Sequence, residues 1–172
     1  FGFKELEGIH SRTDFDLSNH EKFSTKQIKY LDPSDNSKYA PYVLETSIGL
    51  DRMFLAILSQ SYREEVLDNG ESRIFLKIPS VLCPIKAAIL PLTKKDGMPE
   101  KAKEVLNLLR KDFQCHYEEK DSIGKRYRRQ DAIGTPFCIT IDHDTLKDNS
   151  VTIRHRDSMK QERVDIKNVY RI

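Results

Sequence analysis

One eight-residue stretch combines residue types that can bind a charged substrate. Residues 45–52 read Glu-Thr-Ser-Ile-Gly-Leu-Asp-Arg. Arg52 beside a helix N-terminus favours an anion such as a phosphate, and Gly49 lets a ligand approach the backbone. Glu45 and Ser47 are two residues apart on a strand, so both side chains point to one face and can hold an ammonium group. The competing interpretation is a glycine turn with Arg52 solvating a helix end, because short Gly/Arg patterns are common.

A second candidate is the carboxylate of Glu5, within Glu-Leu-Glu-Gly-Ile at residues 5–9. Hard cations such as Mg²⁺ choose oxygen ligands and bridge phosphates. A strand carboxylate beside a phosphate site therefore suits Mg²⁺. Taken alone, an exposed strand glutamate is the simpler explanation.

A third candidate is a basic stretch at residues 120–129, where five cations and the single anion Asp121 give a local charge of +4. The cations are Lys120, Lys125, Arg126, Arg128 and Arg129. Lys125, Arg128 and Arg129 fall at i, i+3 and i+4 on one helical face, with Tyr127 interleaved. Arg154, His155 and Arg156 add cations on a nearby strand. RNA loops are bound by cations on phosphates and by aromatic or Arg stacking on bases. The alternative is a solvated helix face.

Composition narrows these possibilities. The 29 Lys+Arg and 27 Asp+Glu leave a formal charge of +2, which excludes a simple polycationic nucleic-acid binder. With 38% hydrophobic residues the chain can bury a core.

The three cysteines form no CxxC pair and the five histidines have no ligand spacing, so neither a zinc site nor a disulfide framework is predicted. Buried free thiols in a reducing cytosol fit better. The longest apolar run, residues 85–92, is too short to span a bilayer.

The elements that must position the first candidate follow from periodicity. Apolar residues at 50, 53, 54, 57 and 58 have the i, i+3, i+4, i+7, i+8 spacing of one helical face. A short strand at 41–46 precedes them, so the sequence predicts strand, tight turn and helix. We also expect strands at 1–10 and 73–78, a polar turn-prone segment at 11–19, and turns at 32–36 and 69–70.

The second half alternates strands and helices after a segment bracketed by Pro79 and Pro84. Strands are predicted at 85–92, 116–118, 137–141, 151–156 and 161–164. Helices are predicted at 99–113, 121–132 and from Asp165 to Ile172. Asp121 is a candidate N-cap, and Gly134 follows the C-terminus of its helix. Inward positions of the first helix are Ala102, Val105, Leu106, Leu109 and Phe113. This pattern predicts an α/β fold (α+β overall) with a mixed sheet, and a domain boundary between residues 79 and 80.

Taken together, these segments resemble the glycyl-tRNA synthetases, a class II family. Residues 1–9 (FGFKELEGI), 12–17 (RTDFDL) and His20 resemble the stretch before motif 3, and residues 45–52 are similar to motif 3 itself. Most members have Pro where this chain has Thr46, a departure that should matter little if the backbone keeps its path. The segments that resemble the family's anticodon-binding domain are 90–97 (LPLTKKDG), 124–137 (GKRYRRQDAIGTPF) and 148–154 (DNSVTIR).

The resemblance implies a role for each matching residue. Arg52 would hold the γ-phosphate of ATP, with the backbone of Gly49, Leu50 and Asp51 along the adenosine and Leu6 lining the site. Glu5 would face Mg²⁺ and the phosphates. Glycine would lie among Glu45, Ser47 and the backbone of Thr46, Ile48 and Gly49. A pocket for the smallest amino acid must rely on charge, hydrogen bonds and steric exclusion. The expected tRNA contacts are Lys125, Arg126, Arg128, Arg129 and Arg154.

The resemblance also implies an architecture and an activity. Residues 1–79 would end a class II antiparallel-sheet catalytic domain. Residues 80–172 would form a three-layer α/β anticodon-binding domain with a five-stranded mixed sheet. The full-length enzyme would be a cytoplasmic homodimer that activates glycine with ATP and Mg²⁺ and transfers it to tRNA(Gly). Because further class II motifs should precede residue 1, we expect a fragment that is inactive alone.

Two other functions compete with this interpretation. The accessory subunit of the mitochondrial DNA polymerase keeps the same architecture without synthetase activity. The polar and charged set Glu5, Glu45, Ser47 and Arg52 argues against it, because a site without catalytic activity has no reason to keep these groups together. A free-standing anticodon-binding module is the third possibility, but it would not need residues 1–60.

Overall fold

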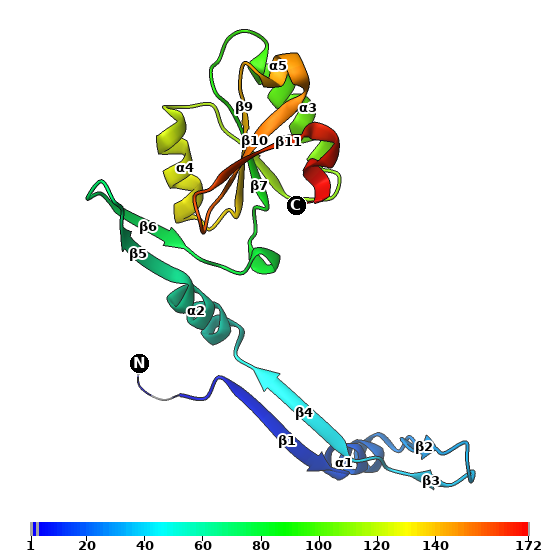
Figure 1. The fold of residues 1–172 in the computed structure, drawn as a ribbon. Helices are drawn as coiled ribbons and strands as arrows, with labels where there is room; N and C mark the ends of the chain where they lie inside the picture. The colour runs from blue at the N-terminus through cyan, green and yellow to red at the C-terminus, as the bar shows by residue number, and fades with distance from the viewer. Residues whose placement is uncertain (1, 3, 172) are drawn as a thin grey trace. The chain divides into compact units, whose positions relative to one another are not determined.

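The computed structural model describes residues 2 and 4–171, and the chain divides into two compact units, 1–56 and 57–172 (Figure 1). Each unit is described by itself. Phe1 and Phe3 of the first expected strand, and Ile172 of the last expected helix, lie outside the described residues.

The first unit is built on an antiparallel pair of strands, β1 (Glu7–Thr13) and β4 (Val43–Ile48). Between them lie helix α1 (Phe15–Ser24) and the short strands β2 (Tyr30–Leu31) and β3 (Lys38–Tyr39). The predicted turn at 32–36 connects β2 to β3. The polar segment at 11–19 is not a turn, because it contains the end of β1 and the first half of α1. No residue of α1 is buried, so the helix has no apolar face that periodicity would reveal.

The predicted strand, turn and helix around Gly49 are confirmed. Strand β4 ends at Ile48, and α2 runs from Leu50 to Ser61. The Met53 N–H donates to the Gly49 carbonyl at 2.9 Å, which closes the first helical turn. Helix α2 crosses from the first unit into the second, since the division falls between residues 56 and 57.

A hairpin follows α2 at once. It consists of β5 (Tyr62–Val66) and β6 (Ser72–Leu76), joined by the predicted Asn69-Gly70 turn. Strand β5 was not predicted, because its sequence Tyr-Arg-Glu-Glu-Val is charged and mostly exposed. The hairpin lies within the second compact unit, although residues 62–76 fall on the first side of the predicted domain boundary.

The second unit contains the predicted five-stranded mixed sheet, in the order β11-β10-β9-β7-β8. Strand β7 (Ala87–Pro91) pairs in parallel with both β8 (Cys115–Tyr117) and β9 (Phe137–Ile141). Strand β10 (Ser150–His155) pairs antiparallel with β9 and with β11 (Gln161–Asp165). All five residues of β7 are buried, as expected of a strand covered on both faces.

Helices cover both faces of this sheet (Figure 1). Helix α3 (Met98–Leu109) packs Ala102, Val105 and Leu109 against one face, together with Val169 of the 3₁₀ helix η2 (Ile166–Arg171). Helix α4 (Ile123–Ala132) packs against Ala88, Leu90 and Cys138 on the other face. Short elements complete the unit: η1 (Ser80–Leu82) precedes β7, and α5 (Thr145–Asp148), which was not predicted, follows β9.

The helix ends differ from expectation at two points and agree with it at two others. Helix α3 ends at Leu109, so Phe113 lies beyond it and is 37% exposed. Asp121 does not cap α4, because Ser122 occupies that position without a side-chain hydrogen bond, and Asp121 has a φ of 70°. At the other end, Gly134 does follow α4, with a φ of 83° that favours glycine. Asp165 accepts a hydrogen bond from the Lys167 N–H at 2.8 Å, as predicted for a cap.

The cysteines and the apolar segments agree with the sequence analysis. Cys83 and Cys138 are buried free thiols, and Cys115 is half-buried. Within the described residues, no helix has both the length and the apolar character needed to cross a membrane.

Candidate functional site

The first candidate site is built on the β1–β4 pair. Glu45 lies directly opposite His10, and Ser47 lies directly opposite Gly8. Because successive side chains of a strand alternate between its two faces, Glu45 and Ser47, two residues apart on β4, point to the same side, as predicted, and His10 shares that side. Gly8 has no side chain there, and its backbone is covered by the imidazole of His10. The structure thus gives Glu45 and Ser47 a common polar surface.

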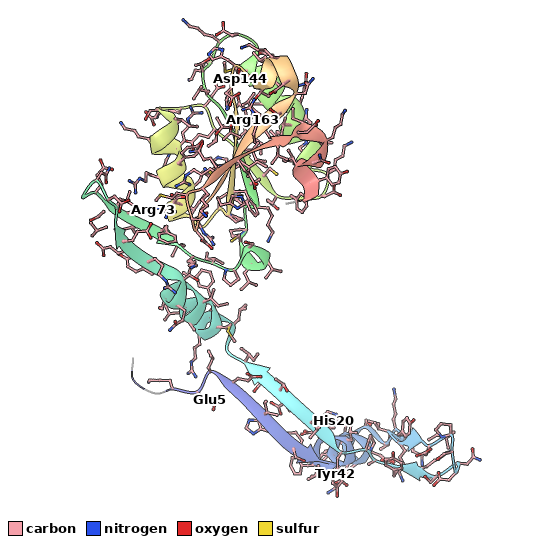
Figure 2. The ribbon with its side chains drawn as sticks, viewed as in Figure 1. Glu5, His20, Tyr42, Arg73, Asp144 and Arg163 are labelled. Atoms are coloured by element: carbon pink, nitrogen blue, oxygen red, sulfur yellow. The ribbon has the colours of Figure 1, made fainter. Side chains whose placement is uncertain are left out.

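The turn after β4 brings two distant predicted residues together. Nη1 of Arg52, in the first turn of α2, donates to the Glu5 carbonyl oxygen at 2.5 Å. The Gly49 N–H donates to the Leu6 carbonyl at 3.3 Å, which ties the start of the helix to the segment before β1. Figure 2 labels Glu5 at this point, ahead of β1. Arg52 is exposed, and a guanidinium has five N–H donors, so this contact leaves donors for a phosphate.

A second cation near Glu45 was not singled out from the sequence. Arg12 forms two hydrogen bonds to the Asp16 carboxylate, at 2.8 and 2.9 Å, and its Nε lies 3.4 Å from Oε2 of Glu45. Hydrogen bonding to Asp16 raises the pKa of Arg12 and lowers that of Asp16. The sequence offered one signal for the Arg12–Asp16 ion pair, which is the i, i+4 spacing of two opposite charges.

The expected magnesium ligand is a single carboxylate. Glu5 is exposed, and the described residues contain no group of three or more His, Cys, Asp or Glu side chains arranged to hold a metal ion. Glu5 therefore fits Mg²⁺ as one ligand of a metal held largely by phosphate oxygens and water.

The basic stretch divides into buried and exposed cations. Arg126 is 1% exposed and donates to the carbonyl oxygens of Pro91 and Glu118, at 2.7 and 3.2 Å. Burial lowers its pKa. Arg154 is 5% exposed and forms a bidentate pair with the Asp131 carboxylate, at 2.8 and 2.9 Å. Both side chains are thus engaged inside the unit.

The other cations of α4 lie nearer solvent. Nη2 of Arg128 donates to Glu71 of the hairpin turn at 3.2 Å. Arg129 pairs with Glu118 at 2.5 Å and with Asp121 at 3.0 Å. Lys125 is exposed, and its ammonium has no hydrogen bond or ion pair to any described residue. Surface ion pairs of this kind exchange readily with other partners.

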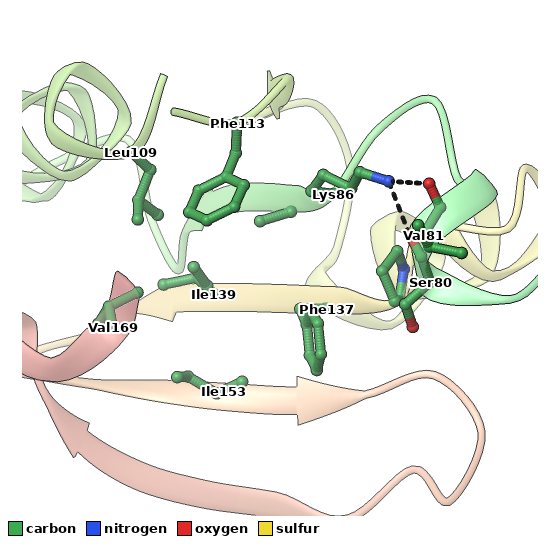
Figure 3. A pocket seen from close by; sticks show the side chains of 11 residues that line it. Ser80, Val81, Lys86, Leu109, Phe113, Phe137, Ile139, Ile153 and Val169 are labelled. Atoms are coloured by element: carbon green, nitrogen blue, oxygen red, sulfur yellow. Dashed lines mark hydrogen bonds between the residues drawn. The ribbon is translucent and has the colours of Figure 1, made fainter. Parts of the chain in front are cut away.

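A separate apolar cavity of about 290 Å³ opens beside the sheet (Figure 3). Its walls include Leu109, Phe113, Phe137, Ile139, Ile153 and Val169. The Lys86 ammonium at its edge donates to the carbonyl oxygens of Ser80 and Val81, at 2.7 and 2.8 Å. None of the residues predicted to bind a ligand lines this cavity.

Comparison with known proteins identifies the second unit. The family model described as "Anticodon binding domain" matches residues 86–172, which contain the whole five-stranded sheet. The chain belongs to the family of proteins that carry this domain.

The predicted resemblance to glycyl-tRNA synthetases is confirmed by the relatives. The chain is 55% identical to the glycine–tRNA ligase of Chlorobaculum tepidum over 96% of its own length and 35% of that protein. It is 56% identical to the ligase of Clostridium tetani, with the same coverage, and 48% identical to that of Borrelia hermsii over 99% of this chain and 39% of the relative. The chain spans a little over a third of the length of these relatives. The alternative as a polymerase accessory subunit is not favoured.

Proposed function

We propose that this chain is part of a glycine–tRNA ligase, in which it supplies the motif 3 segment and the anticodon-binding domain. The observation that supports the catalytic assignment is the arrangement around Gly49. There the guanidinium of Arg52 donates a hydrogen bond to the main-chain carbonyl of Glu5. Glu45 and Ser47 share a face of the adjacent strand β4. These residues combine a phosphate-binding cation with a pair of groups for an ammonium. The remaining parts of a full-length ligase would complete the site.

The proposed reaction has two steps. A carboxylate oxygen of glycine attacks the α-phosphorus of ATP, the bond to the bridging oxygen breaks, and pyrophosphate leaves. The terminal hydroxyl of tRNA(Gly) then attacks the glycyl carbonyl carbon, and AMP leaves. Neither step needs a protein nucleophile, so the rate derives from positioning and charge.

Each residue has a role in this scheme. Arg52 would bind the γ-phosphate and stabilise the departing pyrophosphate, and Glu5 would contribute one oxygen ligand to Mg²⁺ on the phosphates. Glu45 and Ser47 would accept hydrogen bonds from the glycine ammonium, which fixes the carboxylate for attack. The backbone of residues 46 and 48–51 and the side chain of Leu6 would line the glycine and adenosine sites. Mg²⁺, when bound, would supply charge neutralisation of the phosphates.

The anticodon-binding domain would hold tRNA(Gly) partly through α4. The exposed cations Lys125 and Arg129 and the half-buried Arg128 would neutralise phosphates, whereas Arg126 and Arg154 already have internal partners. A homodimeric full-length enzyme in the cytoplasm and the domain boundary at 79/80 remain part of the same proposal.

The test is Arg52→Ala in a full-length ligase that carries this chain. Removing a charge-assisted contact to the transition state costs roughly 10²- to 10³-fold in rate. We therefore expect glycine-dependent ATP–pyrophosphate exchange to fall by about that factor, with tRNA affinity retained. Arg63→Ala is the control, because Arg63 is exposed and donates only to the carbonyls of Gln60 and Tyr62 among the described residues. Near-normal exchange by Arg52→Ala would refute the motif 3 assignment.

A further inference from the structure

A buried ionic cluster joins the β5–β6 hairpin to the anticodon-binding domain. Arg73 of β6 is 1% exposed, and Figure 2 labels it on that strand. Its Nε donates to Oδ2 of Asp131 on α4 at 3.0 Å, and Nη1 donates to Glu65 of β5 at 2.6 Å. Nη2 donates to the carbonyl oxygen of Arg156, just after β10. The guanidinium carbon also lies 4.1 Å from the centre of the Phe75 ring.

The acceptor of this cluster has a second, independent cation. Asp131 is fully buried and forms the bidentate pair with Arg154 of β10. Burial alone would lower the pKa of Arg154, but the hydrogen bonds and charge of Asp131 outweigh it and raise that pKa. Asp131 therefore keeps a charged partner when Arg73 is removed. The hairpin, in contrast, would lose its buried charge contact with α4.

The hairpin is also joined directly to the end of α2, the helix whose first turn carries Arg52. Helix α2 ends at Ser61 and β5 begins at Tyr62, with no residue between them. The Lys77 N–H donates to the Ser61 carbonyl at 2.7 Å, which closes the base of the hairpin against the end of α2. A second anchor lies just beyond, where Nη2 of Arg156 donates to the Ile78 carbonyl at 2.9 Å.

We propose that Arg73 is a positioning residue for aminoacylation, which docks the β5–β6 hairpin on α4 and so holds the end of α2, to which the hairpin is joined, in place within this unit. This role rests on the proposed ligase function. A ligase must hold tRNA and the adenylate in one geometry during transfer, whereas adenylate formation needs no tRNA. Loosening the hairpin should therefore impair transfer to tRNA and leave activation of glycine intact.

The experiment compares Arg73→Met, Arg73→Lys and Arg63→Met in a full-length ligase that carries this chain. Methionine keeps an apolar stem of similar length but removes every donor, and lysine keeps the charge without the planar fork. Arg63 is an exposed cation on the same hairpin, outside the cluster. The measurements are hydrogen exchange of residues 62–76, tRNA affinity, glycine-dependent ATP–pyrophosphate exchange, and kcat and KM for charging.

With Arg73→Met, we expect faster hydrogen exchange in the hairpin but unchanged protection of β7 and β9. Small losses of alignment cost up to about 100-fold in rate, so kcat for charging should fall by roughly 10- to 100-fold. Exchange activity and tRNA affinity should stay near wild type. Arg73→Lys should restore part of the charging rate, and Arg63→Met should match wild type.

Three results would overturn the inference: unchanged hairpin protection, normal charging by a protein whose hairpin is loosened, or an equal loss of exchange and charging. A wild-type ligase without glycine-dependent exchange would instead refute the proposed function, and the positioning role with it. The two failures are thus distinguished by the behaviour of the wild type.

Discussion

Replacing Asp131 with Ala should destabilise the second unit more than any change at its surface. The carboxylate is fully buried and accepts hydrogen bonds from two guanidinium groups, whose side chains are 0% and 6% exposed for Arg73 and Arg154. Removing one partner of a buried ion pair costs about 3–5 kcal/mol, because the remaining charge stays buried without compensation. Domains have total stabilities of about 5–15 kcal/mol, so the loss is a large part of the whole.

The loss can be measured as a shift in the thermal midpoint by circular dichroism. For a unit of about 100 residues, 1 kcal/mol shifts the midpoint by roughly 4 °C or more. A cost of about 3–5 kcal/mol then predicts a drop of at least roughly 12–20 °C. The matched control is Asp121→Asn, which removes the charge of an exposed partner of Arg129, keeps a residue that tolerates the positive φ, and should leave the midpoint nearly unchanged.

A further variant tests the physical reason. Replacing Arg73, Asp131 and Arg154 together with Met, Leu and Leu removes the buried charges along with their partner. Since apolar replacement of a whole buried cluster is often neutral or stabilising, the triple variant should be more stable than Asp131→Ala. A midpoint for Asp131→Ala equal to that of Asp121→Asn, or a triple variant less stable than the single one, would refute the reasoning.

Two further predictions concern an exposed cation and a buried thiol. Lys125→Ala should weaken tRNA binding and make the slope of log affinity against log salt concentration shallower by roughly 0.7–0.9, the value for one phosphate contact. Filter binding at several salt concentrations measures this slope. An unchanged slope would contradict the prediction. Burial raises the pKa of the Cys138 thiol from 9.0 to about 12. Ionisation of this thiol therefore favours the unfolded chain, and its contribution to stability should be present below pH 9 and be lost as pH rises toward 12. Urea titrations of the chain and of Cys138→Ala should then differ in their dependence on alkaline pH, and parallel curves would count against it.

Much of the second unit was predictable because its elements obey simple periodicities. Strand β9 was predicted with its exact bounds, and β7 was predicted from an apolar run. The hairpin strand β5 and helix α1 were missed for a common reason, since neither buries an apolar face. Their positions are set by tertiary contacts, which local patterns do not contain.

The candidate site was predictable in composition but not in its contacts. Glu45 and Ser47 share a face because strand geometry alone requires it. The contact between Arg52 and Glu5 spans 47 positions and ends on a main-chain oxygen, so no side-chain pattern indicates it. Arg12 was overlooked because its relation to Glu45 depends on the pairing of β1 with β4.

The basic stretch illustrates why charge alone does not define a binding surface. Helical spacing places Lys125, Arg128 and Arg129 on one face, and the structure leaves these side chains with surface partners or with none among the described residues. A phosphate can replace Glu71 or Asp121 at little cost, because exposed ion pairs contribute about 1 kcal/mol or less.

Arg126 and Arg154 differ from these three cations, because their buried hydrogen bonds contribute to the stability of the unit. Freeing Arg126 for RNA would take the donor from the buried Pro91 carbonyl, and freeing Arg154 would leave Asp131 with Arg73 alone. Each loss of a buried hydrogen bond costs about 1–3 kcal/mol or more. A single phosphate contact does not recover that cost. The five cations predicted from the sequence thus separate into three whose charged groups reach the surface and two that stabilise the helix and the sheet. Substituting Arg126 or Arg154 should therefore lower the thermal midpoint of the unit and leave the slope of tRNA affinity against salt unchanged.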